Sequence, residues 1–179
     1  MLDTKRRSTA QEKKVAKEIG GIVTPASGAL WGSKADVRNC QFLVECKTTE
    51  KDHYTLNYST WEKIRHEALN DGFREPVMCI DLLSGKNRLA VLDYSVNLDY
   101  LSWVRAQGYT TDFTPVVTIK SSKSLKYSGN TVVLVFPDKR HLSAKRNIEL
   151  IITPWEYFTE YMNLVDEGKS DVFQEAERD

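Results

Sequence analysis

An apolar run that ends in an acid and a lysine constrains this chain more than any other feature. Residues 42–44 are Phe-Leu-Val, and Glu45, Cys46 and Lys47 follow directly. We expect residues 41–48 to form a central strand, in which successive side chains point to opposite faces. The Glu45 carboxylate and the Lys47 ammonium group therefore share one face of this strand, and Cys46 lies on the other.

A second acid, Asp36, precedes this strand. It follows a glycine-containing loop over residues 25–34, and we expect residues 35–37 to form a short strand and residues 38–40 a turn. Asp36 and Glu45 would then supply oxygen ligands for Mg²⁺, with Mn²⁺ as a substitute and the backbone carbonyl of Cys46 as a further ligand. Lys47 would orient the attacking water or meet a phosphate oxygen, as hydrolysis of a phosphodiester requires.

The first predicted helix offers a further carboxylate. Ser8 or Thr9 can cap a helix that runs to about residue 19. On its helical wheel Glu12 falls within the apolar stripe, so we expect it to face the protein body and join the site. Glu18 falls at the edge of the stripe, where we expect it to be solvated. The alternative is that Glu12 completes a capping box with Thr9.

The remaining elements alternate between strands and helices. We expect a polar loop over residues 50–57 and a hairpin turn over residues 84–87. We also expect Ser59 to cap the second helix and Thr153 to cap the last one, with Pro154 at its first position. The predicted elements are strands at 22–24, 77–83, 89–96, 116–120, 131–136 and 148–152 and helices at 60–70, 98–107 and 154–165. This order indicates an α/β fold in which helices pack on a mixed sheet.

Composition limits the class of protein. The chain has 179 residues, of which 41% are hydrophobic, so it is long enough for one domain with a core of its own. No apolar segment is long enough to cross a membrane, and the three cysteines are consistent with reduced thiols, so we expect a cytoplasmic protein, in the host cytoplasm if a phage encodes it.

Charge is unevenly distributed although the formal net charge is zero. Residues 120–146 carry seven Lys or Arg and one acid, whereas residues 149–179 carry nine acids and two bases. A local basic segment can bind phosphates while an acidic tail balances the total. The alternative is a solvated basic surface beside a polar tail.

The residues around Asp36, Glu45 and Lys47 resemble the PD-(D/E)XK nuclease superfamily, and within it the Holliday junction resolvases of archaea and phages. The similar stretch covers about residues 8–83. It includes Glu12, the Ala-Ser-Gly of residues 26–28, the polar segment 49–53, the helix over residues 61–70 and the strand after Pro76.

This resemblance implies a restriction-endonuclease-like mixed central sheet flanked by helices. Residues 1–96 would form the nuclease core, and residues 97–179 would form a C-terminal α+β elaboration of the same domain. It also implies a homodimer that cleaves branched DNA, such as a four-way junction, with Mg²⁺.

Several side chains are candidates for contacts with DNA. They are Ser27, Lys34, Lys51, His53, Lys123 and Lys126. Ser27 is alternatively a turn serine, and His53 is alternatively a solvated histidine. Trp31 either stacks on an unpaired base or packs in the core or in a dimer contact.

The expected function is therefore that of a metal-dependent endodeoxyribonuclease, a Holliday junction resolvase of phage or prophage origin. One alternative is another nuclease of the same superfamily, of nicking, repair or restriction type. A second is a non-catalytic DNA-binding module on the same fold, and a third is an interaction domain in which the motif is accidental.

Overall fold

Eight strands form one mixed sheet in the computed structural model, which describes residues 2–24, 35–118, 120–137 and 147–166. The strands are β1 (Ile22–Val23), β2 (Val37–Arg38), β3 (Phe42–Thr48), β5 (Glu75–Leu82), β6 (Asn87–Asp93), β7 (Thr111–Val117), β9 (Thr131–Pro137) and β10 (Asn147–Pro154). The helices are α1 (Leu2–Glu18), α2 (Tyr58–Asn70), α3 (Leu98–Ala106) and α4 (Trp155–Asp166). The predicted α/β class with a mixed sheet is confirmed.

The sheet runs in the order β1-β2-β3-β5-β6-β10-β9-β7. β3 is parallel to β5 and β7 is parallel to β9, whereas the other neighbouring pairs are antiparallel. β3 and β5 are buried along most of their length, and strands covered on both faces read as continuous apolar runs. β10 pairs with β6, so strands from before and after residue 96 share one sheet.

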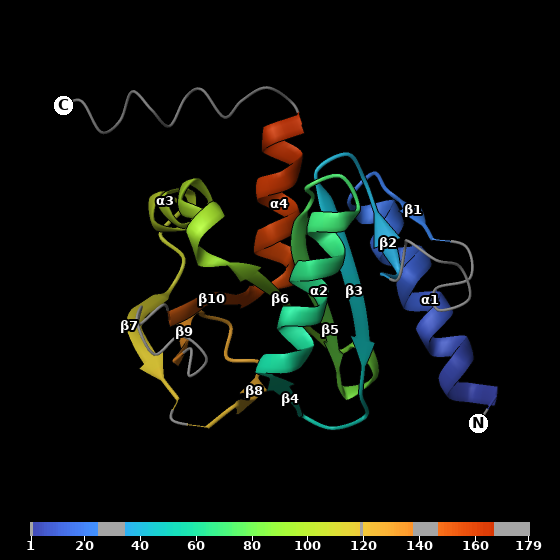
Figure 1. Ribbon diagram of the computed structural model, residues 1–179, viewed down its shortest axis with the longest axis horizontal. Coiled ribbons are helices and arrows are strands. Elements are labelled where there is room, and N and C mark those ends of the chain that lie inside the picture. Colours follow the sequence, from blue (N-terminus) through green and yellow to red (C-terminus); the bar gives the residue numbers. More distant parts are fainter. Residues whose placement is uncertain (1, 25–34, 119, 138–146, 167–179) are drawn as a thin grey trace.

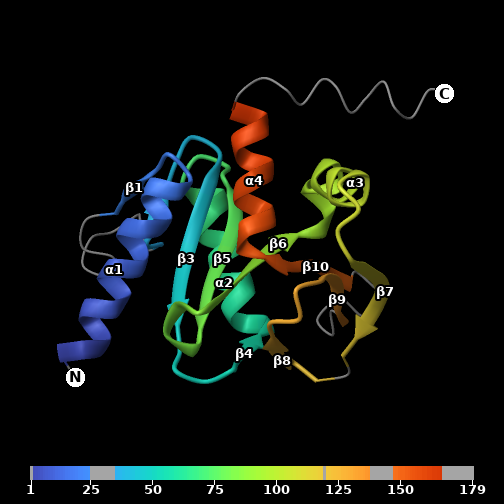
Figure 2. The same ribbon diagram turned by 180° about the vertical axis from the view of Figure 1, so that it is seen from behind.

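Helices cover both faces of the sheet, as Figures 1 and 2 show. On one face, α1, α3 and α4 contribute to a core with the side chains of Phe42, Val44 and Cys46 from β3. On the other face, Trp61 and Ile64 of α2 pack on Met78 and Ile80 of β5. Strands in the middle of the sheet therefore contribute alternate side chains to two cores, which we call the α1-side core and the α2-side core.

Two segments that were not among the predicted strands form a ribbon of two antiparallel strands. These are β4 (His53–Asn57) and β8 (Ser122–Lys126), and the register pairs His53 with Lys126. Each strand has one fully or nearly buried leucine, Leu56 and Leu125, that packs into the α2-side core. The prediction of a loop over residues 50–57 was therefore wrong. Each leucine is surrounded by polar residues, so the sequence shows no apolar pattern typical of a strand.

Several predicted boundaries also shift. α1 begins at Leu2 rather than near Ser8 or Thr9, and Asn57 rather than Ser59 occupies the position before α2. The strand predicted at 116–120 is β7, which begins earlier, at Thr111. The turn between β5 and β6 is the 3₁₀ segment η1 (Leu83–Gly85), whose three residues have positive φ angles of 51°, 58° and 88°. A second 3₁₀ turn, η2 (Tyr94–Val96), follows β6.

α4 starts at a buried hydroxyl rather than at a cap. Thr153 has no exposed surface, and its Oγ1 is 2.7 Å from both Tyr100 Oη and Thr131 Oγ1. The expected capping role of Thr153 was therefore wrong, because this side chain joins β10 to α3 and β9. The aromatic side chains of Trp155 and Phe158 are buried in the core shared with α1 and α3.

A glycine pair ends α1 and lets the chain turn toward β2. Gly20 has a φ angle of 60°, and the Gly21 amide donates to the Ala16 carbonyl at 2.8 Å. A Cβ atom on Gly21 would lie 2.7 Å from the Arg38 carbonyl oxygen. This close approach fixes β2 against the end of α1, which matters because Asp36 directly precedes β2.

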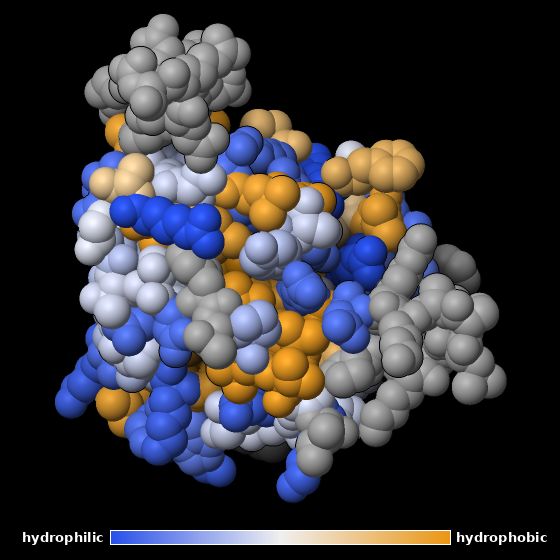
Figure 3. Space-filling view, turned by 90° about the vertical axis from the view of Figure 1, so that its left-hand side faces the viewer, coloured by the Kyte–Doolittle hydropathy of each residue, from blue (hydrophilic) through white to orange (hydrophobic). Residues whose placement is uncertain are grey.

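The face shown in Figure 3 has apolar side chains at its surface. Figure 3 shows hydrophobic surface in the middle of this face, surrounded by more hydrophilic residues. Val116 and Val117 of the edge strand β7 are exposed by 37% and 61%. None of the helices in the described ranges is long and apolar enough to cross a membrane.

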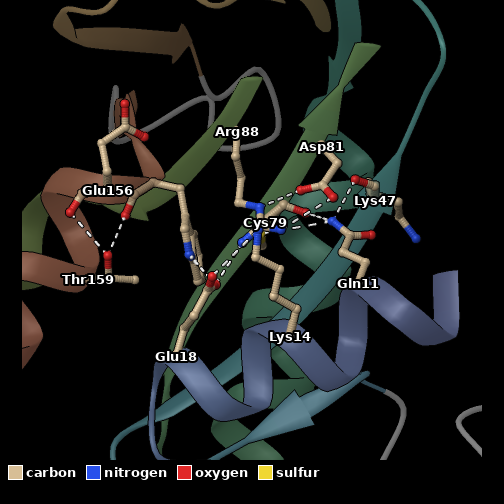
Figure 4. A network of polar contacts seen from close by, with 10 residues as sticks. Gln11, Lys14, Glu18, Lys47, Cys79, Asp81, Arg88, Glu156 and Thr159 are labelled. Carbon is tan, nitrogen blue, oxygen red and sulfur yellow. Dashed lines mark hydrogen bonds and ion pairs between the residues drawn. The ribbon is translucent and has the colours of Figure 1, made fainter. Parts of the chain in front are cut away.

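A nearly buried arginine ties α1, the β5–β6 hairpin and α4 together (Figure 4). Arg88 Nε donates to Asp81 Oδ1 at 2.6 Å, and Arg88 Nη1 donates to Glu18 Oε2 at 2.7 Å. The Trp155 indole donates to the same Glu18 oxygen at 2.9 Å. Our expectation of a solvated Glu18 was therefore wrong, because this side chain is held by structural contacts.

This network predicts a large difference between two substitutions. Asp81→Ala should lower the free energy of unfolding by about 3 kcal/mol, because it removes the more deeply buried of the two carboxylates that bind the Arg88 guanidinium group. Lys14→Ala should cost less than about 0.5 kcal/mol, because Lys14 Nζ is exposed and 3.9 Å from Glu18. Urea unfolding measures both values, and equal costs would contradict the structural role of Arg88.

Candidate active site

A tight hairpin places Asp36 beside β3. Asn39 builds its turn, since its Oδ1 accepts hydrogen bonds from the amides of Gln41 and Phe42 at 3.0 and 2.6 Å. β2 then pairs with β3 in a register that sets Val37 opposite Val44. The Asp36 amide donates to the Val44 carbonyl at 3.2 Å, and Asp36 Oδ2 accepts from the Cys46 amide at 2.8 Å. The Asp36 carboxylate is thus fixed against the strand that carries Glu45.

Glu45 and Lys47 form an ion pair along β3. The Lys47 Nζ is 2.6 Å from Glu45 Oε1, which matches the shared face that strand alternation predicts. Glu45 is only 7% exposed, whereas the Lys47 side chain is 36% exposed. Cys46 points into the α1-side core. A buried acid therefore lies behind a lysine that reaches solvent.

The electrostatics show that these groups act on one another. The pKa of Asp36 is raised from 3.8 to about 6, mainly by burial and in addition by the negative charges of Glu45 and Glu12. The hydrogen bond from the Cys46 amide and the charge of Lys47 oppose this rise. For Lys47, burial lowers the pKa, but the hydrogen bond and charge of Glu45 outweigh it and the pKa is raised. Lys47 is therefore a cation at neutral pH.

The site retains an unused buried oxygen. Glu45 Oε2 is buried and has no hydrogen-bond partner among the described residues. A buried carboxylate oxygen without a donor is costly, and a bound cation would satisfy it. Asp36 and Glu45 are thus an oxygen donor set that suits Mg²⁺, which binds through one or two carboxylates and keeps several waters. Within the described ranges, no three His, Cys, Asp or Glu side chains already gather as a metal site.

Glu12 lies near this pair. It is half-buried, its Oε1 accepts a hydrogen bond from Ser8 Oγ at 2.9 Å, and its charge acts on the Asp36 carboxyl group. Because α1 begins at Leu2, Thr9 is inside the helix, and the alternative of a capping box with Glu12 was wrong. Of the two candidate acids Glu12 and Glu18, Glu12 acts on Asp36, whereas Glu18 is engaged by Arg88.

Gln11 is a residue of this region that sequence analysis missed. Its Nε2 donates to the backbone carbonyls of Lys47 and Cys79 at 3.0 and 3.3 Å, as Figure 4 shows. It is 4% exposed and joins α1 to β3 and β5 at the level of the Glu45–Lys47 pair. The sequence did contain a signal that Gln11 is buried, because it lies four residues before Val15 and so on the same side of the helix.

Three of the six candidate DNA contacts meet on the β4–β8 ribbon. His53 and Lys126 are paired across it and bind the two oxygens of Asp52, at 2.7 and 3.0 Å, and Lys123 is exposed on β8. Burial raises the pKa of the adjacent Tyr54, and the charges of Lys47 and Glu45 also act on it, so the ribbon borders the site. Lys51 is exposed between β3 and β4.

The other candidates lie outside the described residues. These are Ser27, Lys34 and Trp31, which belong to the segment 25–34. Their assignment to DNA contacts stays a prediction. The basic segment 120–146 is described only at residues 120–137, where β8 carries Lys123 and Lys126.

Comparison with known proteins does not assign a family. No family model matches the chain, and a search of curated proteins found no relative. The functional argument therefore rests on the geometry of the site.

The raised pKa of Asp36 predicts a pH-dependent effect on stability. Between pH 3.8 and about 6 the native state binds more protons at Asp36 than the unfolded state, so this group's contribution to stability is present at low pH and lost as pH rises. Without divalent metal, Asp36→Asn should therefore raise the free energy of unfolding by about 1–2 kcal/mol at pH 7.5 and change it little at pH 4. Urea unfolding in EDTA at both pH values measures this.

Asp52 provides the opposite case. It is exposed, and hydrogen bonds from His53 and Lys126 lower its pKa to about 2. Asp52→Asn should therefore give no increase in stability at either pH. If Asp36→Asn is only as stable as the wild-type protein at pH 7.5, the surroundings of Asp36 do not disfavour its ionised form as described.

Proposed function

We propose that this chain is a Mg²⁺-dependent endodeoxyribonuclease that hydrolyses phosphodiester bonds in branched DNA. The observation that carries the proposal is the assembly of Asp36, Glu45 and Lys47 at one point of β3. Two carboxylates are desolvated there, one of their oxygens has no partner among the described residues, and a lysine beside them is open to solvent. A phosphodiesterase needs these groups, namely anionic metal ligands and a cation for the substrate.

In this proposal Asp36 and Glu45 hold the metal, and the Cys46 carbonyl is a further ligand. A bound Mg²⁺ would neutralise charge on the phosphate and lower the pKa of a water molecule. The Cys46 amide keeps the Asp36 carboxylate oriented by its hydrogen bond. Gln11 donates hydrogen bonds to the backbone carbonyls of Lys47 and Cys79 and thereby holds the backbone at Lys47 in place.

Lys47 contributes positive charge at the open side of the site. Its ion pair with Glu45 keeps it protonated, so it acts as a cation and hydrogen-bond donor rather than as a base. A phosphate oxygen or the attacking water would accept a hydrogen bond from its ammonium group. Glu12 adds a third negative charge near Asp36, which favours a divalent over a monovalent cation at this point.

The fold supports the same proposal. The mixed sheet, with α1 on one face, α2 on the other and the acid-x-lysine strand beside a short hairpin, is compatible with the restriction-endonuclease-like arrangement that the sequence resembles. A junction resolvase makes two cuts, and one site per chain then requires a homodimer. Branched DNA as substrate and the homodimer are therefore both parts of the proposal, and the assay below addresses the substrate directly.

The proposal predicts that carboxylate substitutions abolish cleavage. Asp36→Asn and Glu45→Gln should each lower the rate of cutting of a labelled four-way junction in Mg²⁺ by at least about 100-fold, because each removes a charged oxygen ligand. Lys47→Ala should give a similarly large loss, because it removes the cation that meets the phosphate. Rates are measured on gels with junction, linear duplex and single strands as substrates.

The control is Glu160→Gln, which changes an exposed acid on α4 that binds Tyr109 Oη. This variant should cut at the wild-type rate. Paired nicks near the branch point would support a resolvase, and equal cutting of every substrate would replace it with a general nuclease. Wild-type cutting by Asp36→Asn or Glu45→Gln would refute the site, and tight binding without cutting by the wild-type protein would show a DNA-binding module.

A further inference from the structure

We propose that a basic stripe on the solvent face of α1 binds the backbone phosphates of DNA and leads a strand to the Asp36–Glu45 site. The stripe consists of Lys5, Arg6, Lys13 and Lys17. It is separate from the β4–β8 ribbon and from the segment 120–146, to which phosphate contacts were assigned from the sequence. This inference rests on the proposed function, because it names a surface that the same substrate would occupy.

The stripe follows from the periodicity of α1. At about 100° per residue, these four side chains fall within about one third of the helix circumference. All four are exposed, while Gln11 and Val15 on the other side are buried. The stripe extends about 18 Å along the helix axis from Lys5 to Lys17. This length is enough to contact several phosphates, since one strand of B-DNA rises about 3.4 Å per nucleotide.

The charges of the stripe are available to a ligand. Other basic residues of α1 have acidic partners, since Arg7 binds Glu50 and Lys14 lies near Glu18. Among the ion pairs of the described residues, none includes a stripe residue. The stripe also borders a surface hollow of about 400 Å³, which is lined by Lys5, Arg6, Thr9, Ala10 and Lys13. A concave basic surface of this kind fits a phosphate group better than a convex one.

The position of the stripe relative to the site supports a role in substrate binding. Lys5 and Glu12 are seven residues apart, which places them on the same side of the helix two turns apart. Glu12 acts on Asp36, so one edge of the stripe adjoins the acidic cluster. The negative charges of Asp36, Glu45 and the nearby Glu12 repel a polyanion, and the single charge of Lys47 does not balance them. Cations just outside the acidic cluster offset this repulsion without occupying the metal position.

The chemistry of α1 favours nucleic acid over an anionic membrane. A helix that lies on a membrane has an apolar face next to its basic face, and it inserts this apolar face into the lipid. Val15 and Ala16 of α1, and Ile19 directly after it, are instead buried in the core with the side chains of the sheet. The exposed side offers Thr9 and Ala10 between the charges, so it can contact phosphates but has nothing to insert.

The experiment compares the wild-type protein with the double variant Lys13→Gln/Lys17→Gln. Binding to a fluorescent four-way junction is measured in EDTA, so that no cutting occurs, at several salt concentrations. Each phosphate contact contributes about 0.9 to the slope of log affinity against log salt, so the slope should fall by roughly 2. Affinity at about 0.1 M salt should fall by at least tenfold. Glutamine keeps helix propensity similar to that of lysine, and a thermal melt checks that the variant is folded.

A matched control removes two cations elsewhere. Lys63→Gln/Arg105→Gln lowers the net charge equally on α2 and α3, where both side chains are exposed. This control should keep the wild-type salt slope. An equal fall in the control would overturn the inference, since the effect would then come from net charge alone. Stronger binding of the wild-type protein to phosphatidylserine vesicles than to DNA would also overturn it.

The outcomes separate this inference from the proposed function. If the wild-type protein cuts DNA and the stripe variant binds with unchanged slope and affinity, the nuclease proposal stands and the stripe is only a solvated helix face. If the wild-type protein binds DNA through the stripe but does not cut in Mg²⁺, the nuclease proposal falls and the binding surface stands. If the wild-type protein neither binds nor cuts DNA, both are wrong.

Discussion

The hydrogen bond between the Cys46 amide and the Asp36 carboxylate is the contact on which the candidate site depends. β2 has only two residues, so backbone pairing alone holds little of the hairpin against β3. The side chain of Asp36, the residue directly before β2, continues this pairing by one more hydrogen bond. The same bond that completes the hairpin brings a second carboxylate next to Glu45. Local folding and the chemistry of the site are therefore joined in one residue.

The site is electrostatically unfavourable in the absence of a ligand. Asp36 is desolvated beside two other acids, and Glu45 leaves one oxygen without a partner among the described residues. Such a cluster lowers the stability of the fold, and functional sites commonly carry this kind of cost. The Arg88 network shows a contrasting arrangement in the same protein, since Asp81 and Glu18 both form ion pairs with one guanidinium group. Asp81 and Glu18 each have an ion-pair partner, whereas at the site the three acids Asp36, Glu45 and Glu12 carry more charge than the neighbouring Lys47 can balance.

The sequence predicted the centre of this arrangement well and its surroundings poorly. Strand alternation was sufficient to place Glu45 and Lys47 on one face, because the apolar run before them identifies a buried strand. Helical periodicity correctly predicted that Glu12 faces the protein body. It wrongly predicted a solvated Glu18, because the partner of Glu18, Arg88, is 70 residues away in the sequence. The β4–β8 ribbon escaped prediction since its two strands each bury a single leucine. Gln11 escaped because a polar residue that bonds to backbone carbonyls leaves no mark in a hydrophobic pattern.

α1 shows how one helix can divide several tasks among its sides. Its apolar side packs on the sheet and Gln11 extends this contact to the backbone of β3 and β5. Glu12 stands at the border of the buried side, where its charge reaches Asp36. The outer side carries cations that, among the described residues, have no acidic partner. Since a rigid helix fixes the angles between these sides, a phosphate chain that lies along the cations is held at a constant distance from the carboxylates. Positioning of substrate and metal would then follow from the 3.6-residue repeat of a single element.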